Sequence, residues 1–246
     1  MDAIFYYMYF NPISTLICQK KAIVFDLFHT LTAPEITAPS GLTTSQILGI
    51  EMEIWNRQLT ERSIDRLKGV EKDPYLIIEK LARAINPNIS NELIVQATEH
   101  RLKRFDNALT LIPKETYDVL RALKESGKKL ALLSNADVIE SKSWNKSPIA
   151  HFFDSVIFSC DVGFVKPERE IFEICLHQLC ELPQDCAFVG DGGSNELSGA
   201  KASGMTSILI TGIIEKIWPH KIEKFKPDAD FVIRDLAELI QTETNH

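Results

Sequence analysis

Four segments of this chain carry polar residues of catalytic type directly after an apolar run or in a nearby loop. In the first, Ala22-Ile-Val-Phe-Asp26, a run that fits a buried strand ends on a carboxylate. The other three carry Ser134 with Asn135, Lys166 before Pro167, and Asp191 with Glu196. Carboxylates, a hydroxyl and a lysine are the groups needed for a nucleophile, an anion-binding site and a metal ligand set.

The position of Asp26 in the sequence makes its carboxylate a candidate functional group. Turn-like polar residues follow it, so Asp26 is expected at the end of its strand. In open α/β sheets, ligands bind beyond the carboxyl ends of the strands. By itself, this aspartate fits a strand-end cap as well as it fits a nucleophile or a metal ligand, and the other three segments must decide between these alternatives.

Taken in this order and at these wide separations, the four segments resemble the four motifs of the haloacid dehalogenase-like (HAD) hydrolase superfamily. The resemblance extends from Lys21 to the last predicted strand. It implies an α/β fold with a Rossmann-like parallel sheet as its core.

The apolar pattern independently predicts alternating strands and helices. Strands rich in β-branched and aromatic residues are expected at residues 22–25, 129–133, 155–158, 187–189, 207–210 and 230–233. Helices are expected at residues 114–126, 168–180 and 195–203. Such alternation predicts a parallel sheet with right-handed crossovers.

Residues 33–111 break the alternation, because their apolar spacing is helical throughout. One amphipathic helix each is predicted at residues 45–59, 74–85 and 91–105. A helical insert directly after the first motif resembles the C1 cap of the superfamily, which lies over the active-site mouth. The predicted division is therefore an α/β core of residues 21–32 and 112–246, a helical cap of residues 33–111, and an N-terminal extension of residues 1–20 with no assigned role.

The resemblance implies a role for each polar residue. Asp26 would be the nucleophile that forms an aspartyl intermediate, and Lys166 would neutralise the nucleophile and the phosphoryl group. Thr30 and Ser134 would bind phosphoryl oxygens, although either hydroxyl could instead cap its turn. Asn135 would orient substrate or neighbouring backbone.

The fourth segment bears on metal binding. In metal-dependent members of the superfamily, Mg²⁺ is held by the nucleophile, a backbone carbonyl two residues later and an acid of the last motif. Here these would be Asp26, the carbonyl of Phe28, and Asp191, with Glu196 available directly or through water. Haloacid dehalogenases carry no acid at the position of Asp191, so this residue favours phosphate chemistry.

Phe28 departs from the phosphatase pattern. Phosphatases of the superfamily generally carry a second aspartate there, which protonates the leaving alcohol and activates water. Haloacid dehalogenases carry an aromatic residue at this position. His29 has a suitable pKa range to replace the acid, but strand alternation predicts that it points away from Phe28.

Three functions remain open on these residues. The favoured one is a Mg²⁺-dependent phosphatase acting on a small phosphorylated metabolite. The second is a 2-haloacid dehalogenase, which Phe28 supports. The third is a catalytically silent HAD-fold binding protein, which the complete set of nucleophile, lysine and metal acid argues against.

Composition limits the possible partners. A net charge of −7, a pI near 5.4 and scattered basic residues argue against nucleic-acid binding. The aromatic run 4–10 is too short to span a bilayer and lacks a basic start, so neither a membrane anchor nor a secretion signal is predicted. Five cysteines without a Cys-x-x-Cys pair indicate a reducing, cytoplasmic setting. A monomer or homodimer is expected.

Overall fold

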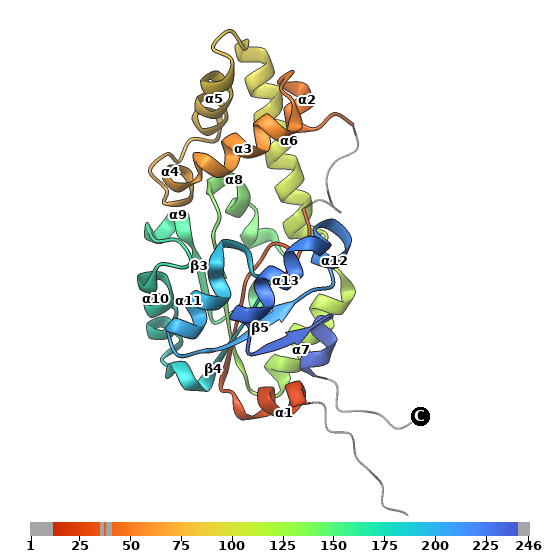
Figure 1. Ribbon diagram of the computed structural model, residues 1–246, viewed down its shortest axis with the longest axis vertical. Coiled ribbons are helices and arrows are strands. Elements are labelled where there is room, and N and C mark those ends of the chain that lie inside the picture. The colour runs from red at the N-terminus through yellow and green to blue at the C-terminus, as the bar shows by residue number, and fades with distance from the viewer. Residues whose placement is uncertain (1–11, 35–36, 38–40, 241–246) are drawn as a thin grey trace, which may run out of the picture.

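A parallel β-sheet forms the centre of the computed structural model, which describes residues 12–34, 37 and 41–240 (Figure 1). Within these residues, six strands stand in the order β3-β2-β1-β4-β5-β6, and all neighbouring strands are parallel. The strands are β1 (Ala22–Phe25), β2 (Lys129–Ser134), β3 (Ser155–Phe158), β4 (Cys186–Gly190), β5 (Thr206–Ile210) and β6 (Phe231–Ile233). The six predicted strands are confirmed to within one residue at either end.

The central strands are apolar throughout because both faces of the sheet are covered. In β1, Ile23 and Phe25 belong to one hydrophobic cluster, whereas Ala22 and Val24 belong to another on the opposite face. All four side chains are fully buried. A strand buried on both faces shows a continuous apolar run rather than an alternating one, which is the pattern at residues 22–25.

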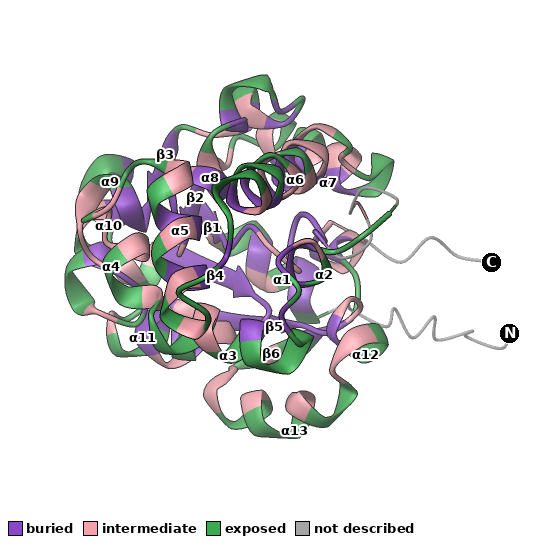
Figure 2. Ribbon diagram, turned by 90° about the horizontal axis from the view of Figure 1, so that it is seen from above, coloured by how far each residue is buried: buried purple, intermediate pink, exposed green. Residues whose placement is uncertain are grey.

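Helices cover the two faces of the sheet (Figure 2). Those bounding the first face are α1 (Pro12–Gln19) and α7 (Lys114–Glu125), and those bounding the second are α10 (Arg169–Leu179) and α11 (Glu196–Ala202). The apolar side of α7 places Leu120 and Leu123 in the first cluster. The helix ends just before Gly127, whose φ of 82° lies in the left-handed region that glycine adopts without strain. The three helices predicted for the core are confirmed within two residues.

The extension 1–20 is only partly described. The aromatic run 4–10 lies outside the described residues, but α1 follows it and buries Ile13 and Ile17 in the cluster of the first sheet face. This helix is therefore part of the core packing, which its sequence alone did not predict.

A second group of helices lies above the carboxyl ends of the strands (Figure 1). These are α2 (Thr44–Ile47), α3 (Met52–Glu61), α4 (Ser63–Leu67), α5 (Pro74–Ile85) and α6 (Asn91–Thr110). All of them except α4 share a hydrophobic cluster that includes Trp55, Ile78 and Ile94. Helix α5 is confirmed at its predicted bounds, and α6 extends five residues beyond residue 105, which brings Leu109 into the cluster of the sheet.

The prediction of one helix at residues 45–59 was wrong. The chain instead forms α2 and α3, with a break between Ile47 and Met52. Gly49, at φ 64°, closes the first of these helices in the left-handed conformation. The apolar spacing continues across the break because both helices face the same cluster, so periodicity alone could not reveal it.

Short helices complete the described chain. They are α8 (Val138–Ser141), η1 (Trp144–Lys146), η2 (Ala150–Phe152), α9 (Ser159–Val162), η3 (Pro183–Asp185), η4 (Gly193–Asn195), α12 (Ile214–Ile217), η5 (Pro219–Lys221), α13 (Ile222–Phe225), η6 (Lys226–Asp228) and η7 (Leu236–Leu239). Among the described residues, no helix is both long enough and apolar enough to cross a bilayer.

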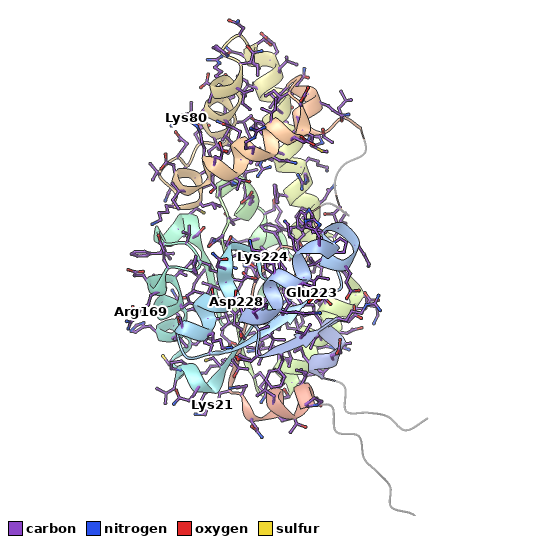
Figure 3. All side chains as sticks on the ribbon, viewed as in Figure 1. Lys21, Lys80, Arg169, Glu223, Lys224 and Asp228 are labelled. Atoms are coloured by element: carbon purple, nitrogen blue, oxygen red, sulfur yellow. The ribbon has the colours of Figure 1, made fainter. Side chains whose placement is uncertain are left out.

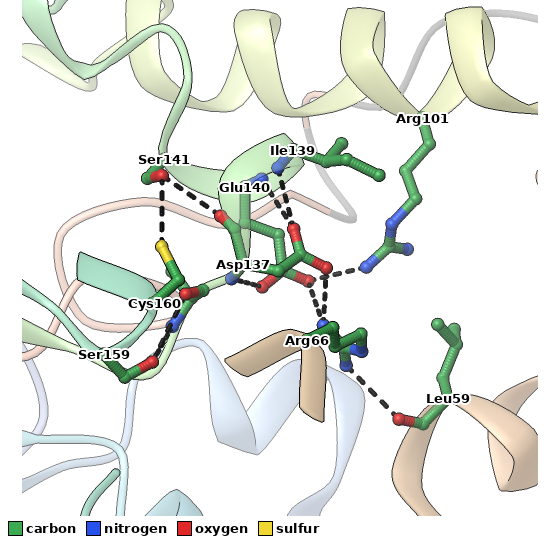
Figure 4. Close-up of polar contacts among 10 residues, drawn as sticks. Leu59, Arg66, Arg101, Asp137, Ile139, Glu140, Ser141, Ser159 and Cys160 are labelled. Atoms are coloured by element: carbon green, nitrogen blue, oxygen red, sulfur yellow. Dashed lines mark hydrogen bonds and ion pairs between the residues drawn. The ribbon is translucent and has the colours of Figure 1, made fainter. Parts of the chain in front are cut away.

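Four charged side chains, three of them buried and Arg66 partly buried, join the upper helices to α8 (Figure 4). Arg66 of α4 donates to Asp137 at 2.7 Å and to Glu140 at 3.3 Å, and Arg101 of α6 donates to Glu140 at 2.6 Å. Asp137 is fully buried, and it also caps α8 by accepting from two backbone amides of that helix. Because each carboxylate faces an arginine, this charge cluster fixes the upper helices over the loop that follows β2.

Two more contacts lie beside the charge cluster. Lys68, just after α4, pairs with Glu168 at 2.6 Å. Gly69 approaches the carbonyl of Cys160 in α9 so closely that an added Cβ would lie 2.0 Å from the oxygen. A side chain at position 69 would therefore push α4 away from the core.

We expect Arg101→Met to lower the free energy of unfolding by about 3–5 kcal/mol, because it removes one partner from a buried set of charges. Lys103→Met is the matched control, since Lys103 is exposed on the same helix and its replacement should change stability by less than about 0.5 kcal/mol. Urea unfolding followed by circular dichroism measures both. Equal stability of the two variants would contradict a structural role for the charge cluster.

Candidate active site

The four polar segments meet at the carboxyl edge of the sheet. Asp26 follows β1, Ser134 ends β2, and Asp191 follows β4, and these three strands are direct neighbours. The chain proceeds outward from β1 in one direction through β2 and β3, and in the other through β4, β5 and β6. The switch point of the sheet therefore lies between β1 and β4, where ligands of such folds bind.

Lys166 connects two of the acids. Its Nζ lies 2.5 Å from Asp26 Oδ1 and 2.5 Å from Glu196 Oε2. All three side chains are buried, with Lys166 3% exposed. A lysine is tolerated at such depth only when opposite charges satisfy it, and here two carboxylates do so.

The pKa values of this group follow from burial and from mutual charge. Burial raises the pKa of Asp26, and the charge of Lys166 opposes that shift. Burial also raises the pKa of Glu196 well above its usual value, and the charge of Asp26 acts in the same direction. Burial alone would lower the pKa of Lys166, but the two carboxylates outweigh it and hold this pKa above its usual value. Lys166 is therefore a permanent cation at neutral pH.

Asp191 is the third acid of the site. Burial would raise its pKa, but the hydrogen bond and charge of His29, together with the backbone amide of Gly193, hold that pKa below its usual value. His29 Nδ1 lies 3.3 Å from Asp191 Oδ2, and the Gly193 amide donates to Oδ1 at 2.7 Å. The carboxylate of Asp191 is thus held ionised close to Asp26.

The hydroxyl and amide residues of the predicted site are also present. Thr30 Oγ1 donates to Asp26 Oδ2 at 3.2 Å, so Thr30 and Lys166 together hold both oxygens of the carboxylate. Ser134 and Asn135 line the same cavity, whose volume is about 260 Å³. Asn135 Nδ2 donates to the Lys166 carbonyl at 3.0 Å and its Oδ1 accepts from the Lys166 amide at 2.7 Å. The amide of Asn135 therefore orients neighbouring backbone and fixes the start of the lysine side chain.

Asp26, Asp191 and Glu196 form an acidic cluster that could hold a metal ion. Each offers one oxygen within 4.8 Å of the others. Oxygen donors in this number suit a hard divalent cation, and a cation would relieve the repulsion between carboxylates that share one lysine. The carbonyl of Phe28 accepts no hydrogen bond from the part of the chain that the structure describes, so it is available as a fourth donor.

Glu196 differs from the other two acids. Its Oε2 is engaged by Lys166, and its Oε1 accepts from the Gly192 amide at 3.0 Å. Both oxygens therefore already have donors. This geometry favours contact between Glu196 and a metal through water. In Asp26 and Asp191, by contrast, Oδ2 has only a longer contact, to Thr30 and to His29 respectively, and can bind a metal directly.

Strand alternation was the wrong basis for placing His29 relative to Phe28, and both residues line the cavity. Strand alternation does not apply here, since β1 ends at Phe25 and His29 has a left-handed φ of 63°. The ring of Phe28 packs against Phe105 of α6 at 5.2 Å between centroids, and the ring of His29 against Trp218 at 4.9 Å.

Sequence reasoning missed part of the cavity wall. Ser194, Trp218, Lys221 and Phe225 also line it. The last three come from the segment between β5 and β6, which carries no motif and forms only short helices. The Trp-Pro-His-Lys stretch at 218–221 was the available signal, but nothing in one sequence places it beside Asp26.

The fold and the site together define a class of enzyme, a hydrolase with buried carboxylates at the switch point of a parallel sheet. Comparison with known proteins agrees. The family described as haloacid dehalogenase-like hydrolase matches residues 20–204. The chain belongs to this family.

Relatives with assigned names include two archaeal glyceraldehyde 3-phosphate phosphatases. The chain is 32% identical to that of Methanopyrus kandleri over 199 residues, which cover 77% of this chain and 83% of the relative. It is 35% identical to that of Methanothermobacter thermautotrophicus over 127 residues, which cover 50% of this chain and 55% of the relative. That second match spans only about half of the relative's length.

The solved structure of L-2-haloacid dehalogenase from Xanthobacter autotrophicus aligns with a TM-score of 0.60 at 18% identity, and the alignment covers 90% of this chain and 97% of the dehalogenase. At this level of identity, the likeness concerns the fold alone.

We expect Asp26→Asn to lower kcat by about 10³-fold or more, because the amide keeps the shape of the carboxylate but is a poor nucleophile. Asp65→Asn, at an exposed aspartate of α4, is the matched control and should keep full activity. Steady-state hydrolysis of p-nitrophenyl phosphate, with circular dichroism to check folding, measures both. Comparable turnover by the Asp26→Asn variant would assign the nucleophile to another residue.

Proposed function

We propose that this protein is a Mg²⁺-dependent phosphatase that hydrolyses small phosphorylated metabolites through an aspartyl-phosphate intermediate. The observation that carries the proposal is Asp191, ionised and within 4.8 Å of a ligand oxygen of Asp26. A second acid beside the nucleophile suits a cation that shields a phosphate, whereas displacement of halide needs no such cation. The names of the two archaeal relatives support the same chemistry.

The roles of the residues follow from their contacts. Thr30 and Lys166 orient the Asp26 carboxylate for attack on phosphorus, and Lys166 offers positive charge to the transferring oxygens. Ser134, which is buried at the cavity wall, donates a hydrogen bond to a phosphoryl oxygen without adding charge. Asn135 acts through Lys166, as a positioning residue. Water then hydrolyses the acyl phosphate and regenerates Asp26.

Asp26, Asp191 and the carbonyl of Phe28 would hold Mg²⁺, with Glu196 contacting it through water. When bound, this ion supplies positive charge that stabilises the phosphoryl group during transfer.

We also propose that residues 33–111 act as a C1 cap over a core of residues 21–32 and 112–246. Two observations support this division: α2, α3, α5 and α6 share a hydrophobic cluster, and α2 to α6 lie above the end of the sheet that carries Asp26. The substrate is then a small molecule that fits between cap and core. Cytoplasmic location remains part of this proposal.

A 2-haloacid dehalogenase is the alternative, and the aromatic ring of Phe28 favours it. Halide release from 2-chloropropionate, assayed beside hydrolysis of p-nitrophenyl phosphate, distinguishes the two activities. Halide release without phosphate release would overturn the phosphatase, and the absence of both would favour a silent binding protein.

We expect hydrolysis to require Mg²⁺ and to be inhibited by Ca²⁺. Calcium accepts more ligands at longer distances, so Asp26 would bind it through both oxygens and lose its free nucleophilic oxygen. The measurement is the initial rate in chelator, in Mg²⁺ and in Mg²⁺ with increasing Ca²⁺. Full activity in chelator would contradict the metal assignment.

The phenylalanine at position 28 predicts a dependence on the leaving group. General acid catalysis contributes about 10²- to 10⁴-fold when the departing oxygen is strongly basic, and Phe28 offers no proton. Aryl and acyl phosphates should therefore be hydrolysed much faster than alkyl phosphates. Phe28→Asp should raise the alkyl rates selectively, whereas Phe28→Leu removes the ring without adding an acid and should not.

The measurement is log kcat/KM against leaving-group pKa for the parent protein and both variants. A flat dependence in the parent protein would mean that another acid serves the site, with His29 the first candidate because it lines the cavity.

A further inference from the structure

A second cavity adjoins the site and shares two residues with it. Its volume is about 710 Å³, and it extends from Trp218 and Lys221 to the wall formed by α2, α3 and α6. The same two residues line the cavity that holds Asp26. Trp218 and Lys221 therefore stand at the boundary between the phosphate site and the space open to the rest of a substrate.

Lys221 has no carboxylate partner in the described part of the chain. Its Nζ lies 3.9 Å from the centroid of the Trp218 ring, which holds the ammonium group in place without neutralising it. Glu223, the acid nearest to it in the sequence, pairs instead with Lys226 at 2.5 Å. The ring of Trp218 thus positions the ammonium group of Lys221, which can bind an anion.

The charge of the residues that line the second cavity also favours binding of an anion. Among the described residues that line it, none is an aspartate or a glutamate, although the chain carries a net charge of −7. Arg104 lines the wall as a second basic side chain, and the hydroxyl groups of Thr44 and Ser45, which contact His100 and Thr43, make the wall polar. An anionic group entering this space meets basic side chains and, among the lining residues that the structure describes, no carboxylate.

We propose that Lys221, held by Trp218, binds a second anionic group on the leaving-group side of the substrate. The substrate class is then phosphate esters or anhydrides whose leaving group carries its own carboxylate or phosphate. This inference rests on the proposed phosphatase function and adds a specificity-determining residue to it.

Three aryl phosphates that differ only at the meta position test the proposal: phenyl phosphate, 3-carboxyphenyl phosphate and 1,3-phenylene bisphosphate. We expect Lys221→Met to lower kcat/KM for the anionic esters by about 10-fold or more, with little change for phenyl phosphate. The ratio of kcat/KM between the variant and the parent protein is taken for each ester separately, so differences in leaving-group chemistry between the esters cancel. An effect on only one anionic ester identifies the second group as carboxylate or as phosphate.

Two variants control the experiment. Lys224→Met makes the same change on α13, at an exposed lysine that lines neither cavity, and should leave all three esters unaffected (Figure 3). Lys221→Arg keeps the charge and should retain most of the preference. A preference for anionic esters that is unchanged in Lys221→Met would overturn the subsite.

A binding measurement separates this proposal from the phosphatase itself. In the Asp26→Asn background, calorimetric titration with 3-carboxyphenyl phosphate and the bisphosphate should show weaker binding when Lys221→Met is added. If Lys221→Met changes the affinity for neither ester, the subsite is overturned, whatever the enzymatic activity of the parent protein. If Lys221→Met weakens binding but the parent protein hydrolyses none of the esters, the subsite is supported and the phosphatase is overturned.

Discussion

The site depends on one buried cation. Lys166 lies between Asp26 and Glu196, and without it two carboxylates would be buried without a charged partner. The surrounding structure serves this interaction: Asn135 fixes the backbone of Lys166 from the neighbouring strand end, and the Gly192 amide holds the second oxygen of Glu196. The lysine therefore links three strand ends that are far apart in the sequence, and the carboxylate of Asp26 takes its orientation from that link.

The sequence predicted the sheet and the reacting groups because both depend on local features. A continuous apolar run such as residues 22–25 indicates a strand buried on both faces, and a carboxylate after it indicates the functional edge. Ser134 and Asp191 followed from the same pattern, whereas Thr30 and Lys166 were assigned through the resemblance to the HAD motifs. Arguments that extended a regular pattern past its end failed: a left-handed Gly49 interrupts the helix expected at residues 45–59, and the left-handed backbone of His29 cancels the alternation of the strand.

Other residues could not be predicted because their importance comes only from contacts across the fold. Trp218 and Lys221 belong to a segment without motif or strong periodicity, and only the folding of β5 and β6 beside β4 brings them to the site. In the sequence, Arg66 and Arg101 are indistinguishable from surface residues of amphipathic helices. Their burial follows from the position of α4 and α6 over Asp137 and Glu140, which are 71 and 39 residues away along the chain, respectively.

The charge cluster between these helices and the core also has an evolutionary consequence. Asp137 and Glu140 stand two and five residues after Asn135, so the segment that brings Asn135 to the site also carries the carboxylates that receive the two arginines. A set of helices transplanted from a homologue without those arginines would leave two acids buried without cations. Recombination between relatives should therefore keep α4, α6 and α8 together, and engineered chimaeras should exchange them as one unit.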